Sequence, residues 1–456
     1  MKLELVPSAD STAFRTQRLR IAMLSNVGGK GLSIALQLLA LPLAIAALGV
    51  DRFGIYAMLV VLLNWINFAG LAINPGLTVQ ILRASSAGNR DAESRIFTTA
   101  FLFGLLAAVC AFIGLHLFFQ AIGIVQLFGA AATQYQNEVE GGILILVAFM
   151  SLSIVLSIVE GAQAGYQNQY VNNLLGALGS GFSVIAIVIV VKQYPTIPNL
   201  IMAIYGAPLV ARVLNMLHLF WHHSYLLPWR GQFSMDVLRT MLATGSAFLM
   251  TLLGSFCYQN FSIYWAGHEL GPAGAAQMSV MMLVITLSGS MLIIVTQPLW
   301  PAIQHAVLHD DLMWVHRAYR RVLRNLVPYT VLGALTLALG GEYILNFWLN
   351  SGVTINLATR LLWGLYFFLI AWEHICHTML MGFNRFWFSS ICYLIGALVM
   401  LITSVILCRL IGITGIFVGL CLGPLTLSVW LFPREIRRML ARDRNVLNSR
   451  ADQLIE

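Results

Sequence analysis

The sequence predicts an all-α polytopic membrane protein with about 12 transmembrane helices in two pseudo-symmetric six-helix lobes. Three observations support this fold class: the chain is 59% hydrophobic, only 10% of its residues are charged, and its mean hydropathy is +0.82. So few polar residues cannot cover a water-facing surface, so lipid must be the solvent. In hydrocarbon every backbone donor and acceptor needs an internal partner, and apolar runs of about 20 residues therefore form helices.

The apolar runs define twelve spans with short polar connections. The first six cover positions 24–48, 53–73, 96–120, 141–160, 173–191 and 199–220. The second six cover positions 237–266, 275–298, 325–344, 357–381, 387–408 and 412–432. The internal prolines, such as Pro42, Pro208, Pro328 and Pro424, are compatible with helices because neighbouring helices can satisfy the freed backbone groups.

Lys and Arg residues predict the orientation of these spans. Of the 26 Lys and Arg residues, twenty fall on the side of the N-terminus, whereas the other side holds only Arg52, Lys192, Arg360 and Arg409. Cytoplasmic connections carry the excess of basic residues, which places both termini on the cytoplasmic side of the membrane. The net charge of +8 then follows from topology and anionic lipid, and no nucleic-acid partner is expected.

The chain divides into four parts: a basic cytoplasmic tail at 1–23, a first lobe at 24–230, a second lobe at 231–432 and a basic tail at 433–456. Two turns of the first lobe recur in the second. Leu48-Gly49 matches Leu270-Gly271, and the segment 161–168 matches 378–385. Both halves begin in the cytoplasm, which predicts a pseudo-two-fold axis along the membrane normal. Common turn chemistry is the alternative explanation for these short matches.

Two amphipathic segments lie outside the spans. Asp310-Asp311 can cap a helix with one apolar stripe and one basic face, and the tail after Pro433 is similarly basic. Both are interpreted as helices on the inner leaflet, with a solvated linker helix as the alternative. The six cysteines lie in or beside spans without CxxC spacing, so the sequence predicts neither a disulfide framework nor a metal site. No cofactor is expected.

The sequence resembles the twelve-span polysaccharide exporter branch of the multidrug/oligosaccharidyl-lipid/polysaccharide (MOP) superfamily, which includes the O-antigen flippases. The resemblance lies in the basic tail 15–20 leading into 28–32 (GGKGL), in 48–56 (LGVDRFGIY) and in 161–166 (GAQAGY). It implies a MATE-like fold that works by alternating access and moves a lipid-pyrophosphate-linked oligosaccharide outward. One departure is Asn74-Pro75-Gly76-Leu77, where the family often has an acidic residue before Gly-Leu.

Ionisable residues inside spans are costly, so each is a candidate for function. Lys30 and Arg212 lie in the inner half of the first lobe and are candidates for binding an anionic substrate. The alternatives are an ammonium that reaches the headgroups for Lys30 and an ion pair with Glu160 for Arg212. Glu160 is also a candidate for ion coupling.

The tenth predicted span carries Glu373, His374 and His377. Glu373 and His377 are one helical turn apart on a shared face and could couple transport to protons, because histidine titrates near neutral pH. A packing pair is the alternative, and a metal site is the weakest interpretation.

Five amide side chains on apolar faces could line a path for sugars, or could hydrogen bond between helices. They are Gln37, Asn64, Asn67, Gln259 and Asn260.

Three classes of function remain. The first is a flippase for an anionic lipid-linked oligosaccharide, whose partners would be this substrate, membrane lipids and other polysaccharide assembly proteins. The second is a cation-coupled multidrug exporter, which would need an intramembrane carboxylate in the first lobe, where only Glu160 is found. The third is a membrane-embedded polymerase or ligase, which is disfavoured because the longest outer connection, 121–140, lacks His, Asp, Lys and Arg. We therefore expect a transporter and no enzyme.

Overall fold

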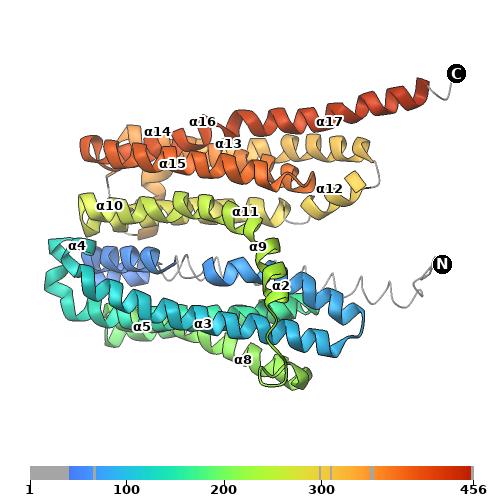
Figure 1. Ribbon diagram of the computed structural model, residues 1–456. Coiled ribbons are helices and arrows are strands. Elements are labelled where there is room, and N and C mark those ends of the chain that lie inside the picture. The colour runs from blue at the N-terminus through green and yellow to red at the C-terminus, as the bar shows by residue number, and fades with distance from the viewer. Residues whose placement is uncertain are drawn as a thin grey trace. The chain divides into compact units, whose positions relative to one another are not determined.

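The computed structural model describes residues 38, 41–64, 68–296, 299–308, 311–349 and 354–452, and these residues form helices joined by turns (Figure 1). Nine helices within them are long and apolar enough to cross a membrane. Each predicted span from 96–120 to 412–432 lies on helical residues, although the helices at 325–344 and at the end of 412–432 extend well beyond the predicted bounds. Of the spans predicted at 24–48 and 53–73, the structure describes helical residues Leu41–Asn64 and 68–73, and Gly49 between the two spans has a positive φ of 76°.

The described chain forms two compact units. The first unit contains the residues up to Gly49, Leu63–Gly123 and Tyr135–Ser246, and the second contains Val50–Leu62, Ile124–Gln134 and the chain from Ala247 onward. The predicted lobe boundary at 230/231 stays a prediction.

The first unit is built on α2, α3, α5, α6 and α8. Its elements are α2 (Phe68–Ser86), α3 (Arg90–Ile122), α5 (Gln136–Gly165), α6 (Gln169–Gln193), α7 (Ile197–Ile201), the π-helical turn η3 (Met202–Gly206), α8 (Ala207–His222), η4 (Ser224–Leu226) and the first part of α9 (Met235–Phe256). The second predicted span is longer than expected, because α2 continues through Pro75 to Ser86. Asn89 then caps α3 by accepting a hydrogen bond from the Ala92 backbone N–H at 3.0 Å.

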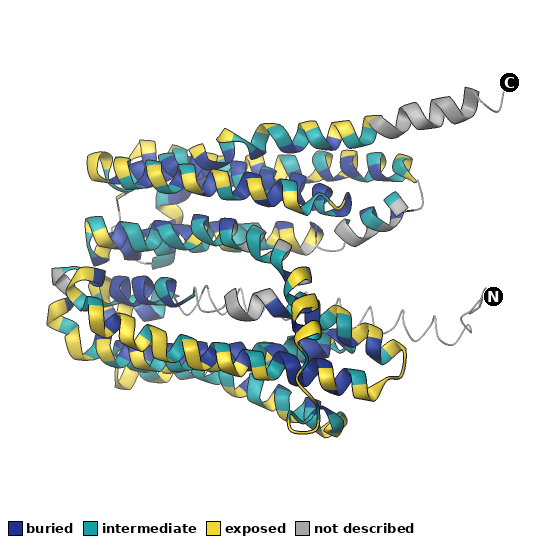
Figure 2. Ribbon diagram, viewed as in Figure 1, coloured by how far each residue is buried: buried dark blue, intermediate teal, exposed yellow. Residues whose placement is uncertain are grey.

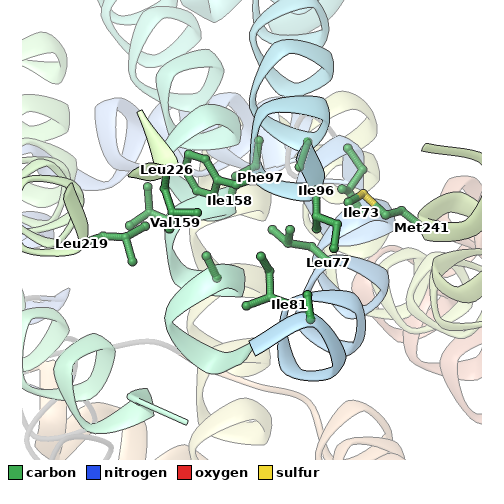
Figure 3. Close-up of a cluster of buried hydrophobic side chains, with 13 residues drawn as sticks. Ile73, Leu77, Ile81, Ile96, Phe97, Ile158, Val159, Leu219, Leu226 and Met241 are labelled. Atoms are coloured by element: carbon green, nitrogen blue, oxygen red, sulfur yellow. The ribbon is translucent and has the colours of Figure 1, made fainter. Parts of the chain in front are cut away.

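A cluster of buried hydrophobic side chains joins the helices of the first unit (Figure 3). Ile73, Leu77 and Ile81 follow one face of α2 and meet Phe97 of α3 and Ile158 of α5. Gly165 allows α5 to approach α2 closely, because a Cβ at this position would lie 2.8 Å from the Ile81 side chain. This packing holds the ends of α2, α3, α5 and α8 together and so positions the polar groups described below.

The second unit contains the remaining elements. They are α4 (Ile124–Phe128), η2 (Ala130–Tyr135), the rest of α9, the π-helical turn η5 (Cys257–Phe261), α10 (Ser262–Leu270), α11 (Pro272–Thr296), α12 (Leu299–Leu308), α13 (Leu312–Leu349), α14 (Leu357–Gly382), α15 (Phe386–Ile411), α16 (Ile413–Thr426) and α17 (Ser428–Asp452).

The predicted inner-leaflet helices differ from the observed ones. Asp311 caps α13 as expected, since its Oδ1 accepts from the Trp314 backbone N–H at 3.0 Å. However, α13 runs without a break into the ninth predicted span, and α17 likewise continues through Pro433. The apolar stripe of α13, including Val315 and Val322, is buried within the second unit, where Val322 packs on α14. It does not serve as a separate lipid-facing surface.

At Pro208 and Pro433, a side chain of a neighbouring helix donates a hydrogen bond to the carbonyl that the proline leaves without a donor. Pro208 cannot donate to the Ile204 carbonyl one turn earlier, and there the chain forms the π-helical turn η3. The Ser183 hydroxyl of α6 donates to this carbonyl at 3.2 Å. In the same way the Trp372 indole N–H donates to the Val429 carbonyl, four residues before Pro433, at 3.4 Å.

The two turns that the sequence pairs between the halves have the same backbone conformation. Gln167 and Asn384 both have a positive φ, at 61° and 58°. Asn168 N–H bonds to the Gln163 carbonyl and Arg385 N–H to the Leu380 carbonyl, which is the same six-residue closure at a helix C-terminus.

Apolar side chains are exposed along the long helices (Figure 2). On α3 they include Leu106, Ile113 and Leu117, whose exposed fractions exceed one half. A soluble protein rarely exposes so much contiguous apolar surface, whereas a helix that faces lipid must do so.

Candidate functional site

Arg212 of α8 and Glu160 of α5 form an ion pair in the first unit. Arg212 Nε lies 2.9 Å from Glu160 Oε1, and the two side chains are 37% and 34% exposed. This is the ion pair that the sequence offered as the alternative for Arg212. The contact uses Nε, and a guanidinium carries further donors on its two terminal nitrogens. The pair thus holds the guanidinium in place inside a helical stretch, Ile197–His222, of membrane-spanning length.

A chain of amide side chains begins at the residue that carries this carboxylate. Asn172 Nδ2 donates to the Glu160 backbone carbonyl at 3.0 Å, and Asn215 Nδ2 donates to Asn172 Oδ1 at 2.7 Å. Gln163 Nε2 then donates to Asn215 Oδ1 and lies 3.1 Å from His218 Nδ1. Gln163 and Asn215 are buried. Interhelical bonds of this kind join α5, α6 and α8.

A second polar cluster surrounds Glu93, a residue that the sequence analysis did not single out. Glu93 is 3% exposed, and its Oε2 accepts hydrogen bonds from the Tyr166 and Tyr225 hydroxyls at 2.5 and 2.6 Å. His223 stacks on Tyr166 with ring centroids 4.2 Å apart, and its Nδ1 lies 3.0 Å from the Tyr225 hydroxyl. Arg90 lies over the Tyr225 ring at 5.5 Å, a cation–π contact.

Burial sets the protonation of this second cluster. The buried position of Tyr225 and its hydrogen bond to Glu93 raise the pKa of the phenol to about 12. Burial likewise raises the pKa of Tyr166, with Glu93 adding to the effect. Burial lowers the pKa of His223, and the nearby Glu93 carboxyl opposes this shift. The tyrosines therefore stay protonated as donors, and the histidine favours its neutral form.

The candidate coupling residues lie in α14 of the second unit. Glu373 and His377 are 1% and 8% exposed, and Glu373 Oε1 and His377 Nδ1 have no hydrogen-bond partner among the described residues. His377 packs edge-on against Tyr393, while His374 Nε2 lies 2.8 Å from the Thr296 hydroxyl of α11. The histidines thus point to separate partners. Within the described chain no three His, Cys, Asp or Glu residues gather as metal ligands.

The structure brings only some of the predicted site residues together. Lys30, Gln37 and Asn67 lie outside the described residues. Asn260 donates to the Phe256 carbonyl of its own helix at 3.2 Å, whereas the Gln259 side chain is exposed. Asn64 is partly buried and makes an interaction of its own.

The sequence matches no family model and no curated protein. Its fold, however, matches solved transporters. An inward-facing multidrug resistance MATE family transporter of the MOP superfamily superposes with a TM-score of 0.74 and 14% identity, over 90% of this chain and 96% of that chain. The outward-facing conformation of such a transporter gives a TM-score of 0.62 and 15% identity, over 92% and 96%.

A third solved structure is a MOP superfamily transporter from Pyrococcus furiosus, described as having a binding pocket of reverse polarity that suggests a different function. It matches with a TM-score of 0.61 and 14% identity, over 92% of this chain and 95% of that chain. The chain therefore has the all-helical MATE fold over nine tenths of its length. Identities this low bear on the fold alone.

Proposed function

We propose that the protein is a flippase that carries a pyrophosphate-linked lipid oligosaccharide from the inner to the outer leaflet of a bacterial inner membrane, with both termini in the cytoplasm. Its substrate would serve polysaccharide or O-antigen assembly, and other assembly proteins are proposed partners. The MATE fold supports a transport role, because the solved structures with this fold are transporters. The sequence resemblance to polysaccharide exporters supports the class of substrate.

The observation that carries the proposal is the position of Arg212. An unpaired buried pyrophosphate would cost several kcal/mol or more, so its path requires fixed cations. Arg212 is 37% exposed and is oriented by Glu160 through Nε. The terminal nitrogens of a guanidinium suit the paired oxygens of a phosphate, so the substrate can engage the fork while the carboxylate keeps it aligned. Lys30 is the second proposed cation of this site.

Transport in proteoliposomes tests the proposal. The probe is a fluorescent short-chain polyprenyl-pyrophosphate oligosaccharide, and its arrival in the opposite leaflet is measured by quenching. Arg212→Gln and Lys30→Gln should each abolish movement, and Arg212→Lys should restore only part of it, because lysine offers a point charge without the fork. The matched control is Arg239→Gln, whose exposed ion pair with Asp236 lies in the same unit. Normal movement in both Gln variants would refute the cationic site.

A cation-coupled multidrug exporter is the second candidate, and the unpartnered polar atoms of Glu373 and His377 favour it. A buried carboxyl and imidazole that each keep one polar atom without a partner among the described residues are suited to take up and release a proton. Replacing Glu373 and His377 together with Gln should flatten the pH dependence of transport in vesicles, whereas His116→Gln, on an exposed part of α3, should not. An unchanged pH profile would show that Glu373 and His377 only pack together and do not couple transport to protons. Movement of a cationic dye but not of the glycolipid would favour this exporter over the flippase.

A further inference from the structure

A polar cavity of about 170 Å³ lies in the first unit, beside the turn between α5 and α6 and the end of α8. It is lined by Gln163, Asn168, Tyr170, His218, Leu219, His222 and His223. The volume corresponds to the liquid share of about six water molecules, which is room for a small polyol or a single sugar ring. The cavity does not include Arg212 or Glu160.

A single backbone carbonyl determines how the amides beside this cavity are oriented. The Glu160 carbonyl can only accept, so the nitrogen of Asn172 must face it, and Asn172 Oδ1 is left as an acceptor. Asn215 therefore presents Nδ2 to Asn172 and Oδ1 to Gln163. It follows that Gln163 must direct Nε2, and not Oε1, toward Asn215.

Gln163 Oε1 is consequently left as a hydrogen-bond acceptor without a donor. Its second N–H points to His218 Nδ1, 3.1 Å away, so both donors of Nε2 are used. Gln163 Oε1 has no hydrogen-bond partner among the described residues, and the residue is only 1% exposed. A buried acceptor without a donor is unfavourable. Gln163 is one of the residues that line the cavity, so a ligand that brings a donor would satisfy this oxygen once the side chain turns it toward the cavity.

His218 and His223 differ in the hydrogen-bonding role of Nε2. His218 accepts at Nδ1, so Nε2 of its neutral ring is a donor. The Tyr225 hydroxyl gives its proton to Glu93, so its oxygen must accept from His223 Nδ1, and Nε2 of the neutral His223 ring is an acceptor. Both histidines line the cavity. Asn168 adds an amide that makes no capping hydrogen bond.

The geometry points to a binding site for an uncharged, hydroxyl-rich ligand the size of one sugar ring. Each hydroxyl both donates and accepts, and the lining offers acceptors at Gln163 and His223, a donor at His218, and both kinds of group at Asn168. An anion without a hydroxyl or N–H group would leave the Gln163 oxygen unsatisfied, because it brings no donor. The sugar is either free in solution or the headgroup of a glycolipid. This inference stands apart from the proposed flippase activity, since it rests on different residues.

Binding to the full-length protein in nanodiscs tests the site. The free probes are methyl glucoside and N-acetylglucosamine, measured by saturation-transfer NMR, and the lipid-linked probe is a short-chain prenyl-phosphate monosaccharide, measured by competition. His218→Phe removes the Nε2 donor and fills space, and Asn168→Leu removes the amide of another lining residue. Each should weaken binding about tenfold, the effect of losing one or two hydrogen bonds. His116→Phe, at an exposed position of α3, is the matched control.

Binding of the free sugars would identify a site for soluble ligand, and binding of only the lipid-linked probe would identify a headgroup site. Both outcomes support the inference if the two cavity variants weaken binding and the control does not. An absence of binding by every probe, or binding that both cavity variants leave unchanged, would overturn it and leave a water-filled cavity. The proteoliposome assay tests the flippase proposal independently. If the wild-type protein binds sugar but moves no glycolipid, the sugar site is supported and the flippase proposal is refuted.

Discussion

Removing the phenols that bind Glu93 should destabilise the first unit strongly. Tyr166→Phe and Tyr225→Phe each delete one hydrogen bond, of 2.5 and 2.6 Å, to a carboxyl group that is 3% exposed. A hydrogen bond to a charged group contributes about 1.5–3 kcal/mol, so each single variant should lose about that much free energy of unfolding. The double variant leaves the buried carboxyl without either phenol and should lose about 3–5 kcal/mol.

The measurement is reversible unfolding by SDS in mixed micelles, followed by circular dichroism. Tyr194→Phe is the control, because the Tyr194 side chain is 69% exposed in the same unit, and it should lie within about 0.5 kcal/mol of the wild type. Adding Glu93→Leu to the double variant should recover much of the loss, since an apolar group in place of the carboxyl removes the need for partners. Single variants as stable as the Tyr194 control would refute the assignment of Glu93 as a hydrogen-bonded anchor.

Four further outcomes are expected. Ser183→Ala should lower the free energy of unfolding by about 0.5–1.5 kcal/mol, because it removes the hydrogen bond to the Ile204 carbonyl. In a Pro208→Ala background the loss should be smaller, because the backbone N–H of residue 208 can then donate to this carbonyl. Equal losses in the two backgrounds would contradict this. Gly423→Ala should lower the thermal midpoint, because its Cβ would clash with the Tyr258 hydroxyl. Tyr258→Phe should restore part of the loss, and no restoration would contradict this explanation. Burial lowers the pKa of His223 in the folded protein, so the unfolded chain binds a proton at higher pH than the folded chain does. Stability should therefore fall as the pH drops below about 6.5. Thermal unfolding measured from pH 5 to 8 should show this fall in the wild type and a smaller fall in His223→Asn. Cysteines placed at Arg317 and Arg320, which are exposed on α13, should react only with reagents inside the cell, and labelling from outside would reverse the topology.

The helices could be predicted because lipid imposes a simple requirement on length and composition. That requirement also explains where prediction was incomplete. The second span is predicted to end at Ile73, yet α2 continues through Pro75 to Ser86. The apolar stripe of α13 was assigned to the membrane surface, but Val322 packs on Leu326 and on Ile375 of α14, because an apolar stripe has the same periodicity whether protein or lipid covers it.

The candidate site was harder to predict than the helices. The Arg212–Glu160 pair was identifiable because Arg212 lies within a predicted span and Glu160 is the only carboxylate in the predicted spans of the same lobe. The Glu93 cluster was not, since Glu93 lies 73 residues from Tyr166 and 132 from Tyr225, and no periodicity connects such positions. The vacant acceptor of Gln163 was also beyond sequence reasoning, because it depends on the direction of each hydrogen bond in a chain of three amides.

The length of α13 has a mechanical consequence. Its 38 residues extend about 57 Å at 1.5 Å per residue, while the hydrocarbon core is about 30 Å thick. About half of this rod therefore stands in the headgroups and the water beyond when it crosses perpendicular to the membrane. Four arginines lie on the emerging part, and each is attracted to an anionic surface by about 1 kcal/mol. Tilting the rod by about ten degrees would move the end that extends beyond the hydrocarbon by about 5 Å, and with that end at an anionic surface the attraction of its arginines opposes the movement.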